Sequence, residues 1–489
     1  MSSINTNVPS LIAQRNLLVS QQHEDTSLER LSTGLKINSG ADDPAGLIAS
    51  ENLKNQQAGL QQAIDNAGQA GNMIGTAEGG LNEVSSLLTQ VTSLVNQSAN
   101  TGALSASQIA ANQLQVDSIL STINRISDST TFQGSQLLNG NLDYTTSGAT
   151  SAFNNLQVNA ASLPNNAAEN VVVQVTNSAT QGQVIYNATG ANTNTVGPTG
   201  VITGSAVTLE ISGNAGTQQL SFAGSSTISS IAAAVNNVTA TTGVTASAAG
   251  KELVFSAQDY GSNQYVSVKS ISGAFALATG NKVSGTNATV IVNGSQAQTQ
   301  GLDVSYNAQG LDMNFQLTSA GYAGVPLGTN GLNQGETKNF YITGGGANFQ
   351  LGAVVNQTNQ ASIGIQDVST GSLGNNTLGY LSSLGSGGSN SLSSVSLNGA
   401  QKILTAAVSQ VAELRGRLGA FQDYTINSTV NSLNVAFENA SSAESAIADT
   451  NFASETANLT RSQILQQSAT SVLSTANSAP QSVLNLLPH

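Results

Sequence analysis

Few side chains in this 489-residue sequence are suited to acid–base or metal chemistry. Histidine occurs only at His23 and His489, near the two ends of the chain, and cysteine is absent. Imidazole and thiolate groups supply most zinc ligands and much of the acid–base chemistry of enzymes. The sequence therefore predicts no catalytic residue, no metal site, no disulfide and no cofactor.

Two further patterns could support chemistry, but each has a simpler explanation. Asp303 and Asp312 are close enough in sequence to form a carboxylate pair, although two solvated strand or loop residues are the commoner arrangement. The glycine-rich segment GGGANFQLG (344–352) lacks the Gly-Lys-Ser/Thr ending of a phosphate-binding loop. We expect a flexible turn there, and we expect that the protein is not an enzyme.

Charge and composition restrict the possible partners. The formal net charge is −13, and charged residues make up 8% of the chain, against about 25% in a typical protein. Nucleic-acid binders need clustered Lys and Arg, so no nucleic-acid partner is expected. Either an assembly hides much of the surface, or Ser, Thr, Asn and Gln solvate it.

No targeting segment is expected. The N-terminus MSSINTNVPSLIAQRN lacks the basic and apolar regions of a signal peptide. The sequence also contains no run of about 18 apolar residues, the length needed to span a membrane. Export by a dedicated machine that recognises an uncleaved N-terminus is also compatible with the lack of a signal peptide.

Apolar residues recur at helical spacing in both halves of the chain. Asp43 and Pro44 form a good helix start, because Asp caps backbone N–H groups and proline suits the first helical position. The stripe that follows predicts a helix from Pro44 to Asn100, about 85 Å long at 1.5 Å per residue. A second helix is predicted after Gly102 and a third near the other end. The three stripes are Ala77, Leu81, Val84, Leu88, Val91 and Val95; Ile109, Val116, Leu120 and Ile123; and Leu404, Ala407, Val411, Leu414, Leu418 and Phe421.

The two ends carry further stripes that lack an evident partner. The final segment has small and apolar residues at helical spacing, and Pro480 should kink or divide it. We expect these helices to be disordered in the monomer and to order on assembly, although an intramolecular bundle remains the alternative. The stripes are Ile4, Val8, Leu11 and Leu18, interrupted by Arg15 and Gln22, and Leu465, Ala469, Val472, Ala476, Ala479, Val483 and Leu486.

The middle of the chain has a different pattern. Between about residues 166 and 338 the apolar residues alternate, with Gly, Asn and Thr turns between strands such as VVVQVT, VTLEISG and YVSVKS. TISSIAAAVNNV (227–238) predicts one short helix among them. The expected fold is α+β and multidomain: a long coiled-coil-like rod formed by both chain ends, with a β-rich insert.

Several segments resemble bacterial flagellins. LERLSTGLKINSGADDPAGLIAS (28–50) resembles the N-terminal signature of that family. RGRLGAFQDYTINSTVNSLN (415–434) and NFASETANLTRSQILQQSATSVLSTANSAPQSVLNLL (451–487) resemble its C-terminal helices. FQLGAVVNQTNQASIGIQDVSTGSLG (349–374) is similar to the β-hairpin of its rod domain, and residues 207–237 resemble a module shared with hook-associated proteins.

The resemblance implies an extracellular subunit that self-assembles into the flagellar filament for swimming motility. The implied partners are other copies of the chain, the flagellar type III export apparatus, an export chaperone and the filament cap. Two alternatives are a hook–filament junction protein and an adhesin displayed on the filament through the insert. The implied domains are an N-terminal D0 helix and spoke (1–43), the N-terminal D1 rod (44–165), a variable insert (166–338), the C-terminal D1 with hairpin and rod helix (339–454), and the C-terminal D0 helix (455–489).

The resemblance also points to two sets of residues. One set would make assembly contacts in the spoke and the inner tube: Arg30, Lys36, Asp42, Asp43, Leu465, Val472, Leu473, Val483 and Leu486. The other set falls where related proteins carry the arginine, leucine and glutamate that contact Toll-like receptor 5: Gln90, Leu94 and Gln115. Because both charged groups are replaced by amides, weak receptor binding is expected.

Overall fold

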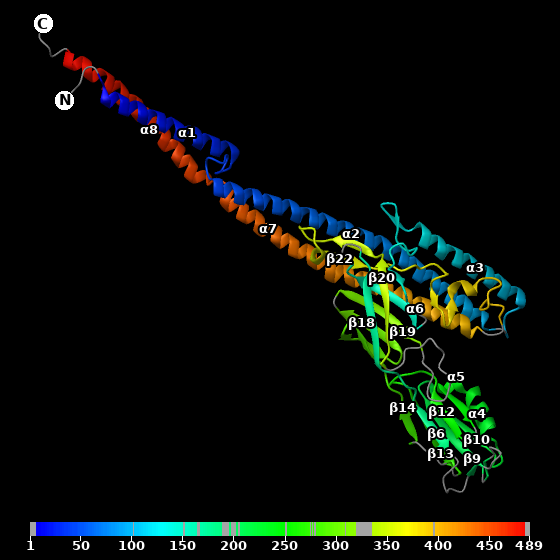
Figure 1. The fold of residues 1–489 in the computed structure, drawn as a ribbon. Coiled ribbons are helices and arrows are strands. Elements are labelled where there is room, and N and C mark those ends of the chain that lie inside the picture. Colours follow the sequence, from blue (N-terminus) through cyan, green and yellow to red (C-terminus); the bar gives the residue numbers. More distant parts are fainter. Residues whose placement is uncertain are drawn as a thin grey trace. The chain divides into compact units, whose positions relative to one another are not determined.

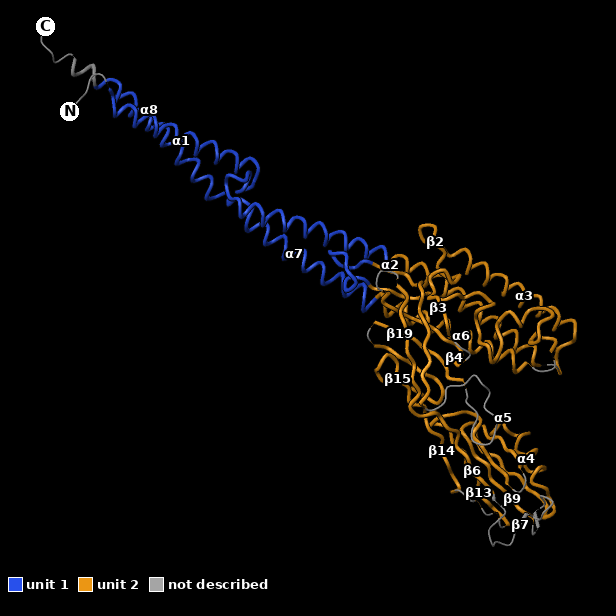
Figure 2. The backbone as a smooth tube through the Cα atoms, viewed as in Figure 1, with its two compact units in different colours: residues 1–71, 350–360, 423–489 blue, residues 72–349, 361–422 orange. Residues whose placement is uncertain are grey.

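The computed structural model describes residues 6–100, 102–149, 152–163, 167–187, 195–196, 202–203, 206–249, 252–273, 275, 277, 280–308, 310–318, 335–394 and 397–484. The chain forms two compact units (Figure 2). The first comprises residues 1–71, 350–360 and 423–489, and the second comprises residues 72–349 and 361–422. Each unit therefore combines segments that are far apart in the sequence.

The first unit contains long helices from both ends of the chain (Figure 1). Helix α1 (Val8–Thr33) pairs with α8 (Phe452–Leu484), and the start of α2 (Pro44–Ser98) accompanies α7 (Ser428–Ala448). The predicted start of the long helix is confirmed, because the N–H of Gly46 donates to Oδ1 of Asp43 at 2.9 Å. Four buried residues form the core between α2 and α7: Leu60, Ala63, Leu433 and Ala440.

The long helices described in the second unit are the rest of α2, α3 (Ala106–Ser129) and α6 (Asn398–Ala420). Every predicted stripe residue of α2, from Ala77 to Val95, is at most 1% exposed. The stripes of α3 and α6 are also buried, except at Ile109 and Phe421, which are half-buried. An ion pair between Nε of Arg415 and Oε1 of Glu78, at 2.9 Å, joins α6 to α2.

Several short elements connect these helices. A seven-residue π-helix, Phe421–Asn427, follows α6. The predicted rod hairpin is present as β21 (Ala347–Gln350) and β22 (Gln360–Ile363), and Gly345 and Gly346 turn before it with φ of 99° and 76°. The remaining short elements are β1 (Thr131–Phe132), β2 (Ser135–Gln136), the 3-10 turns Gln357–Asn359 and Leu381–Leu384, β23 (Gly374–Asn375) and β24 (Gly379–Tyr380).

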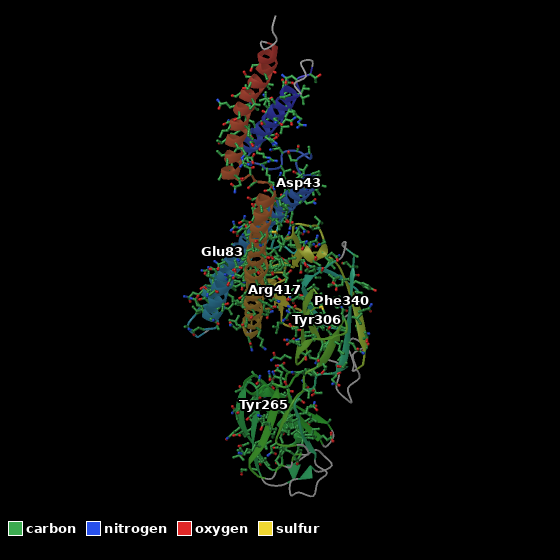
Figure 3. The ribbon with its side chains drawn as sticks, turned by 90° about the vertical axis from the view of Figure 1, so that its left-hand side faces the viewer. Asp43, Glu83, Tyr265, Tyr306, Phe340 and Arg417 are labelled. Atoms are coloured by element: carbon green, nitrogen blue, oxygen red, sulfur yellow. The ribbon has the colours of Figure 1, made fainter. Side chains whose placement is uncertain are left out.

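A first β module forms a two-sheet sandwich. One sheet has the order β16-β15-β5-β20-β3 and the other β17-β18-β19-β4. Their apolar faces meet in one core, where Phe153 of one sheet packs edge-on against Phe340 of the other at 5.6 Å. Figure 3 shows Phe340 and the buried Tyr306 on this module. The strands are β3 (Thr145–Ser147), β4 (Phe153–Ala161), β5 (Glu169–Asn177), β15 (Thr289–Val292), β16 (Ser295–Gln296), β17 (Gln298–Gln300), β18 (Asp303–Ala308), β19 (Leu311–Leu317) and β20 (Thr337–Gly344).

A second β module is inserted within the first. Its sheets have the orders β10-β9-β13-β14 and β11-β12-β6, and the predicted helix is present as α4 (Ile228–Asn237). Thr180 and Thr286 pair as an isolated bridge where the chain enters and leaves this module. The other elements are β6 (Gln183–Asn187), β7 (Thr195–Val196), β8 (Ile202–Thr203), β9 (Val207–Gly213), β10 (Gly216–Phe222), α5 (Thr239–Thr242), β11 (Val244–Ala249), β12 (Glu252–Ala257), β13 (Tyr265–Ser272) and β14 (Lys282–Ser284).

The edges of the β-rich region differ from the expected limits of 166 and 338. Strand β4 lies entirely before residue 166, and β20 continues to Gly344. Both strands are integral to the sandwich, since β4 pairs with β19 and β20 pairs with β5. The change of composition along the sequence marks the limits of the insert only approximately. Whether a strand at the edge belongs to the sandwich depends on the distant strand with which it pairs, and the composition of the edge strand does not show this.

Candidate assembly interface

Helices α1 and α8 meet along a stripe of small and polar residues. The buried residues of α1 are Ser10, Ala13, Ser20 and Ser27, which follow helical spacing. On α8, Glu455 and Ser462 are the buried residues among those whose burial the structure describes, 452–479. Leu473 is half-buried and belongs to the same stripe. It follows the half-buried Gln466 by seven residues and the buried Ser462 by eleven, which is helical spacing. The expectation that the terminal helices have no partner within the chain is therefore wrong.

The large aliphatic residues of both helices lie outside this seam. Val8, Leu11 and Leu18 are 53%, 57% and 60% exposed, so the apolar stripe predicted for α1 does not face its partner helix. Leu465 and Val472 of α8 are 51% and 57% exposed. A seam of serine and alanine is not marked by a stripe of large apolar residues. The large apolar residues mark instead faces that this chain leaves exposed, which include Val8, Leu11, Ile12, Leu18 and Val19 on α1, and Ile464, Leu465 and Val472 on α8.

Pro480 does not end α8, which continues to Leu484. A proline lacks the N–H that would bond the carbonyl four residues earlier, so the oxygen of Ala476 loses its helical donor. The side chain of Asn7 supplies a replacement, because its Nδ2 donates to the oxygen of Ala476 at 2.7 Å. Oδ1 of Asn7 meanwhile accepts from the N–H of Ser10 and caps α1.

A polar cluster joins the other end of the helix pair. Oγ of Ser27 donates to Oε1 of Glu455 at 2.6 Å, and Nη1 of Arg30 lies 4.0 Å from Oε2 of the same carboxylate. Glu455 is only 7% exposed, so it depends on these partners for solvation. Arg30 thus has an acidic partner within its own chain, and Glu455 is a functional candidate that the sequence did not single out.

The predicted spoke lies between α1 and α2. Gly34 adopts a φ of 75°, which favours glycine, and ends α1 as its C-cap. The N–H of Lys36 donates to the oxygen of Ala448, and the N–H of Thr450 donates to that of Gly34, so the spoke is fixed against the connection between α7 and α8. The side chain of Lys36 is exposed.

Asp42 and Asp43 serve the spoke locally. Oδ2 of Asp42 accepts from the N–H and the hydroxyl of Ser39 and from the N–H of Asn38. The hydrogen bond from the backbone N–H of Ser39 is the main cause that lowers the pKa of Asp42 from its usual value. Asp43 caps α2, as described above. Both carboxylates therefore have roles within the chain, and contacts between subunits remain a prediction.

The other candidate residues are placed as follows. Gln90 and Gln115 are exposed on α2 and α3, and Leu94 is half-buried. The side chain of Val483 and all of Leu486 lie outside the described residues. Asp303 accepts from Gln316, whereas Asp312 accepts from Asn159 and Asn307, so the two carboxylates have separate amide partners.

No described helix is both long enough and apolar enough to cross a bilayer. Within the same residues, no three His, Asp or Glu side chains are grouped as ligands for a metal ion.

Comparison with known proteins explains this arrangement. The models of the bacterial flagellin N-terminal and C-terminal helical regions match residues 4–143 and 401–487, and the model of the flagellin hook IN motif matches residues 208–259. The chain is 32% identical to a B-type flagellin of Pseudomonas aeruginosa, with 99% of both chains covered. The chain belongs to the bacterial flagellin family. This flagellin is 30% identical to a flagellin of Salmonella choleraesuis, again with 99% of both chains covered.

Among solved structures, this flagellin is similar to FlgL of Xanthomonas campestris, at 13% identity with 79% of this chain and 98% of that chain covered and a TM-score of 0.25. As a flagellin it is a structural subunit of the extracellular flagellar filament, and its role is in motility.

Proposed function

We propose that this flagellin polymerises by burying the exposed aliphatic faces of α1 and α8 against other copies of the chain. One observation supports this proposal. Helices α1 and α8 bury small residues, mostly serine and alanine, between them, and they leave leucine, isoleucine and valine half-exposed on their other faces. Burial of a Val or Leu side chain contributes roughly 1.5–3 kcal/mol. The eight residues are already about half covered in the free chain, so on assembly each would contribute about half of that amount.

Helix pairs with two different uncovered faces favour a filament over a closed ring. When the face of one copy meets a different face of the next, the contact repeats, and a rotation that does not close produces a helix. We also propose that the spoke residues Arg30, Lys36, Asp42 and Asp43 contact neighbouring copies, and the exposed side chain of Lys36 supports this. The other partners that we propose are the type III export apparatus, an export chaperone and the filament cap. We propose no enzymatic activity.

The test separates the exposed face from the internal seam of α8. Val472→Asp places a charge on the exposed face and should leave the monomer helical while abolishing polymerisation, because burying the carboxylate costs several kcal/mol. Leu473→Asp should in addition weaken the α1–α8 pair. Val472→Ala is the matched control and should still polymerise.

The measurements are circular dichroism of the monomers, followed by sedimentation and negative-stain electron microscopy after seeding. Long filaments from the Val472→Asp protein would contradict the assignment of that face. Short, non-growing assemblies from the unmodified protein would favour the hook–filament junction alternative instead.

A further inference from the structure

One face of the first β module carries polar side chains in two parallel rows. Strand pairing aligns Gln298, Ser305, Asn314 and Gln157 across β17, β18, β19 and β4. The second row contains Gln300, Asp303 and Gln316, and Asn155 of β4 lines the same groove. We call these eight residues the amide platform. The intervening residues Val304 and Phe315 point to the core, so all eight side chains lie on the face away from it.

Asn155 reaches the platform because β4 contains a bulge. Gln157 pairs with Asn314 and Asn154 with Gln316, so two residues of β4 lie opposite Phe315 alone. Asn155 has a φ of 50°, in the left-handed region that Asn tolerates better than most residues. Bulges of this type redirect a side chain and are frequent beside functional sites.

Helix α6 forms a wall beside the platform. A groove of about 550 Å³ lies between them, lined on the helix side by Gln410 and Glu413. Nδ2 of Asn314 donates to Oε1 of Glu413 at 3.3 Å, and Nε2 of Gln316 donates to Oδ1 of Asp303 at 2.9 Å. These bonds fix the two carboxylates in place.

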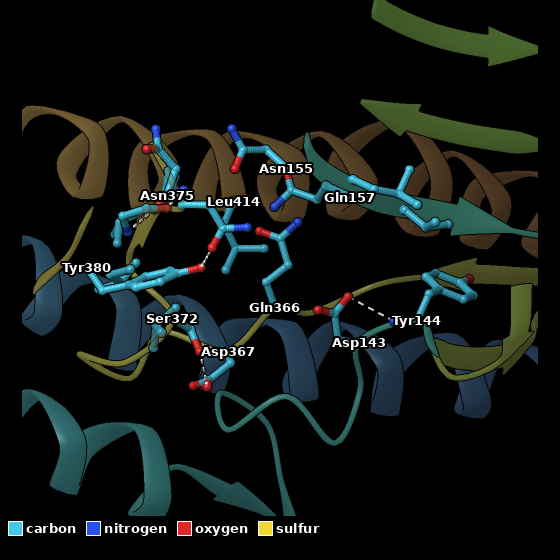
Figure 4. A pocket seen from close by; sticks show the side chains of 18 of the residues that line it. Asp143, Tyr144, Asn155, Gln157, Gln366, Asp367, Ser372, Asn375, Tyr380 and Leu414 are labelled. Atoms are coloured by element: carbon cyan, nitrogen blue, oxygen red, sulfur yellow. Dashed lines mark hydrogen bonds between the residues drawn. The ribbon is translucent and has the colours of Figure 1, made fainter. Parts of the chain in front are cut away.

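A second hollow continues the groove. Its volume is about 410 Å³, and it shares Asn155, Gln157 and Gln410 with the first. Tyr380 contributes an aromatic ring to its lining, and in Figure 4 the side chain of Gln366 extends toward Asn155 and Gln157. Nε2 of Gln366 is buried and has no hydrogen-bond partner among the described residues.

Asp143 lies at the far side of this hollow (Figure 4). Burial raises the pKa of Asp143 to about 6, and the nearby Asp367 adds to the rise, while the N–H of Tyr144 and the charge of Arg417 oppose it. The hollow is thus poorly solvated at this end, which strengthens hydrogen bonds formed there.

The platform has unused hydrogen-bonding capacity. The side-chain amides of Asn155, Gln157, Gln298 and Gln300 bond to no group in the part of the chain that the structure describes. Each amide offers two donors and one acceptor. Adjacent hydroxyls of a sugar offer the same combination at matching spacing, so one amide can bond two neighbouring hydroxyls. Asp303 and Glu413 can accept from hydroxyls but would repel an anionic ligand.

We propose that the groove beside the amide platform binds a neutral oligosaccharide of two or three sugar units. Pockets of 300–1,000 Å³ with a few polar groups are the usual size for small ligands. Tyr380 supplies a surface for one sugar ring, and the amides and carboxylates bind its hydroxyls. None of the residues of this site belongs to α1 or α8, the helices proposed to polymerise.

The test uses full-length monomer and four defined probes: chitotriose, maltotriose, cellotriose and the acidic trimer of galacturonate. Saturation-transfer NMR and calorimetric titration should show saturable binding of at least one neutral trimer. The galacturonate trimer should bind at least about tenfold more weakly, because two carboxylates face it. No saturable binding of any neutral trimer, or tighter binding of the acidic one, would overturn the proposal.

A double variant locates the site. Asn155→Gly suits the positive φ of that position and Gln300 is exposed, so Asn155→Gly with Gln300→Ala should fold normally. It should weaken binding by about tenfold or more, since several neutral hydrogen bonds are lost. Gln218→Ala, which removes an exposed amide from β10 of the second β module, is the matched control and should bind as the unmodified protein does. Equal affinity of the double variant and the control would show that the ligand binds elsewhere.

Discussion

Asn7 illustrates how a single side chain can serve two helices. Its oxygen caps the first turn of α1, and its nitrogen bonds the carbonyl of Ala476 that Pro480 leaves without a donor. Sequence patterns show the proline and predict a break. They do not show that a residue more than 460 positions away repairs the lost bond, because that contact depends on the register of the two helices.

The two roles of Asn7 can be separated by mutation. Asn7→Asp keeps the capping oxygen but removes the donor, and it places a carboxylate against a carbonyl. The pair should lose about 1–3 kcal/mol of stability, even though an acidic N-cap suits the helix dipole. Thermal unfolding of the monomer, followed by circular dichroism and by hydrogen exchange of Ala476–Ala479, measures the loss. Asn16→Asp makes the same chemical change at an exposed position of α1 and is the control; equal effects of the two changes would refute the role of Asn7.

At the scale of elements, periodicity predicted helices better than it predicted their partners. Steps of three and four between large apolar residues located α2 and α6, because those residues are the ones that the helices bury. The same rule failed for α1, whose buried stripe is mostly serine. Strand pairing was also beyond prediction: β4 pairs with β19, about 150 residues later, and no local property of either strand specifies the other. The amide platform could not be foreseen for the same reason.

Helices α2 and α3 carry the surface considered for Toll-like receptor 5. Gln90 and Gln115 are exposed there, so both amides are free to be replaced without disturbing the core. Gln90→Arg with Gln115→Glu should increase receptor activation, because each charge-assisted contact contributes roughly 1.5–3 kcal/mol. A reporter-cell assay on monomeric protein, with Gln90→Lys and Gln115→Asp as near matches, measures the gain. Strong activation by the unmodified monomer would count against the prediction.

The second β module should be removable as one piece. Thr180 and Thr286 exchange backbone hydrogen bonds of 3.0 and 3.2 Å, so the ends left by deleting residues 181–285 are already adjacent. A two-residue Asn-Gly linker suits such a gap. The shortened protein should fold and polymerise, as judged by circular dichroism and electron microscopy. Deleting residues 170–335 should fail by comparison, because it removes β5 and β15 to β19 and uncovers Phe153 and Phe340. Normal filaments from the longer deletion would show that the sandwich is dispensable.

At the scale of the whole molecule, the first unit requires residues from both ends of the chain. That unit draws on residues 1–71, 350–360 and 423–489, so it completes only after the last helix has been made. The sequence indicated this through matching helical patterns at both ends. It could not indicate which residues of α1 and α8 meet.

Removal of residues 452–489 tests this interdependence. The truncated protein loses α8, so the seam residues Ser10, Ala13, Ser20 and Ser27 lose their cover, and α1 should unfold. The helices of the second unit should remain, and polymerisation should be lost. Helix content, sedimentation and limited proteolysis of residues 8–33 provide the measurements. Filaments formed by the truncated chain would exclude α8 from the assembly contacts.

The serine-rich seam also makes the stability of the α1–α8 pair differ between the free and the assembled subunit. Each buried methylene contributes only about 0.8 kcal/mol, and a seam of serine and alanine contains few of them, so the lone helix pair opens at little cost. The amide hydrogens of α1 and α8 should exchange with deuterium within seconds in the free subunit. Once neighbouring copies cover the aliphatic faces, the same hydrogens should persist for days. A subunit built in this way can pass a narrow channel with these helices unfolded, and the same helices become highly stable once they are packed in the assembly.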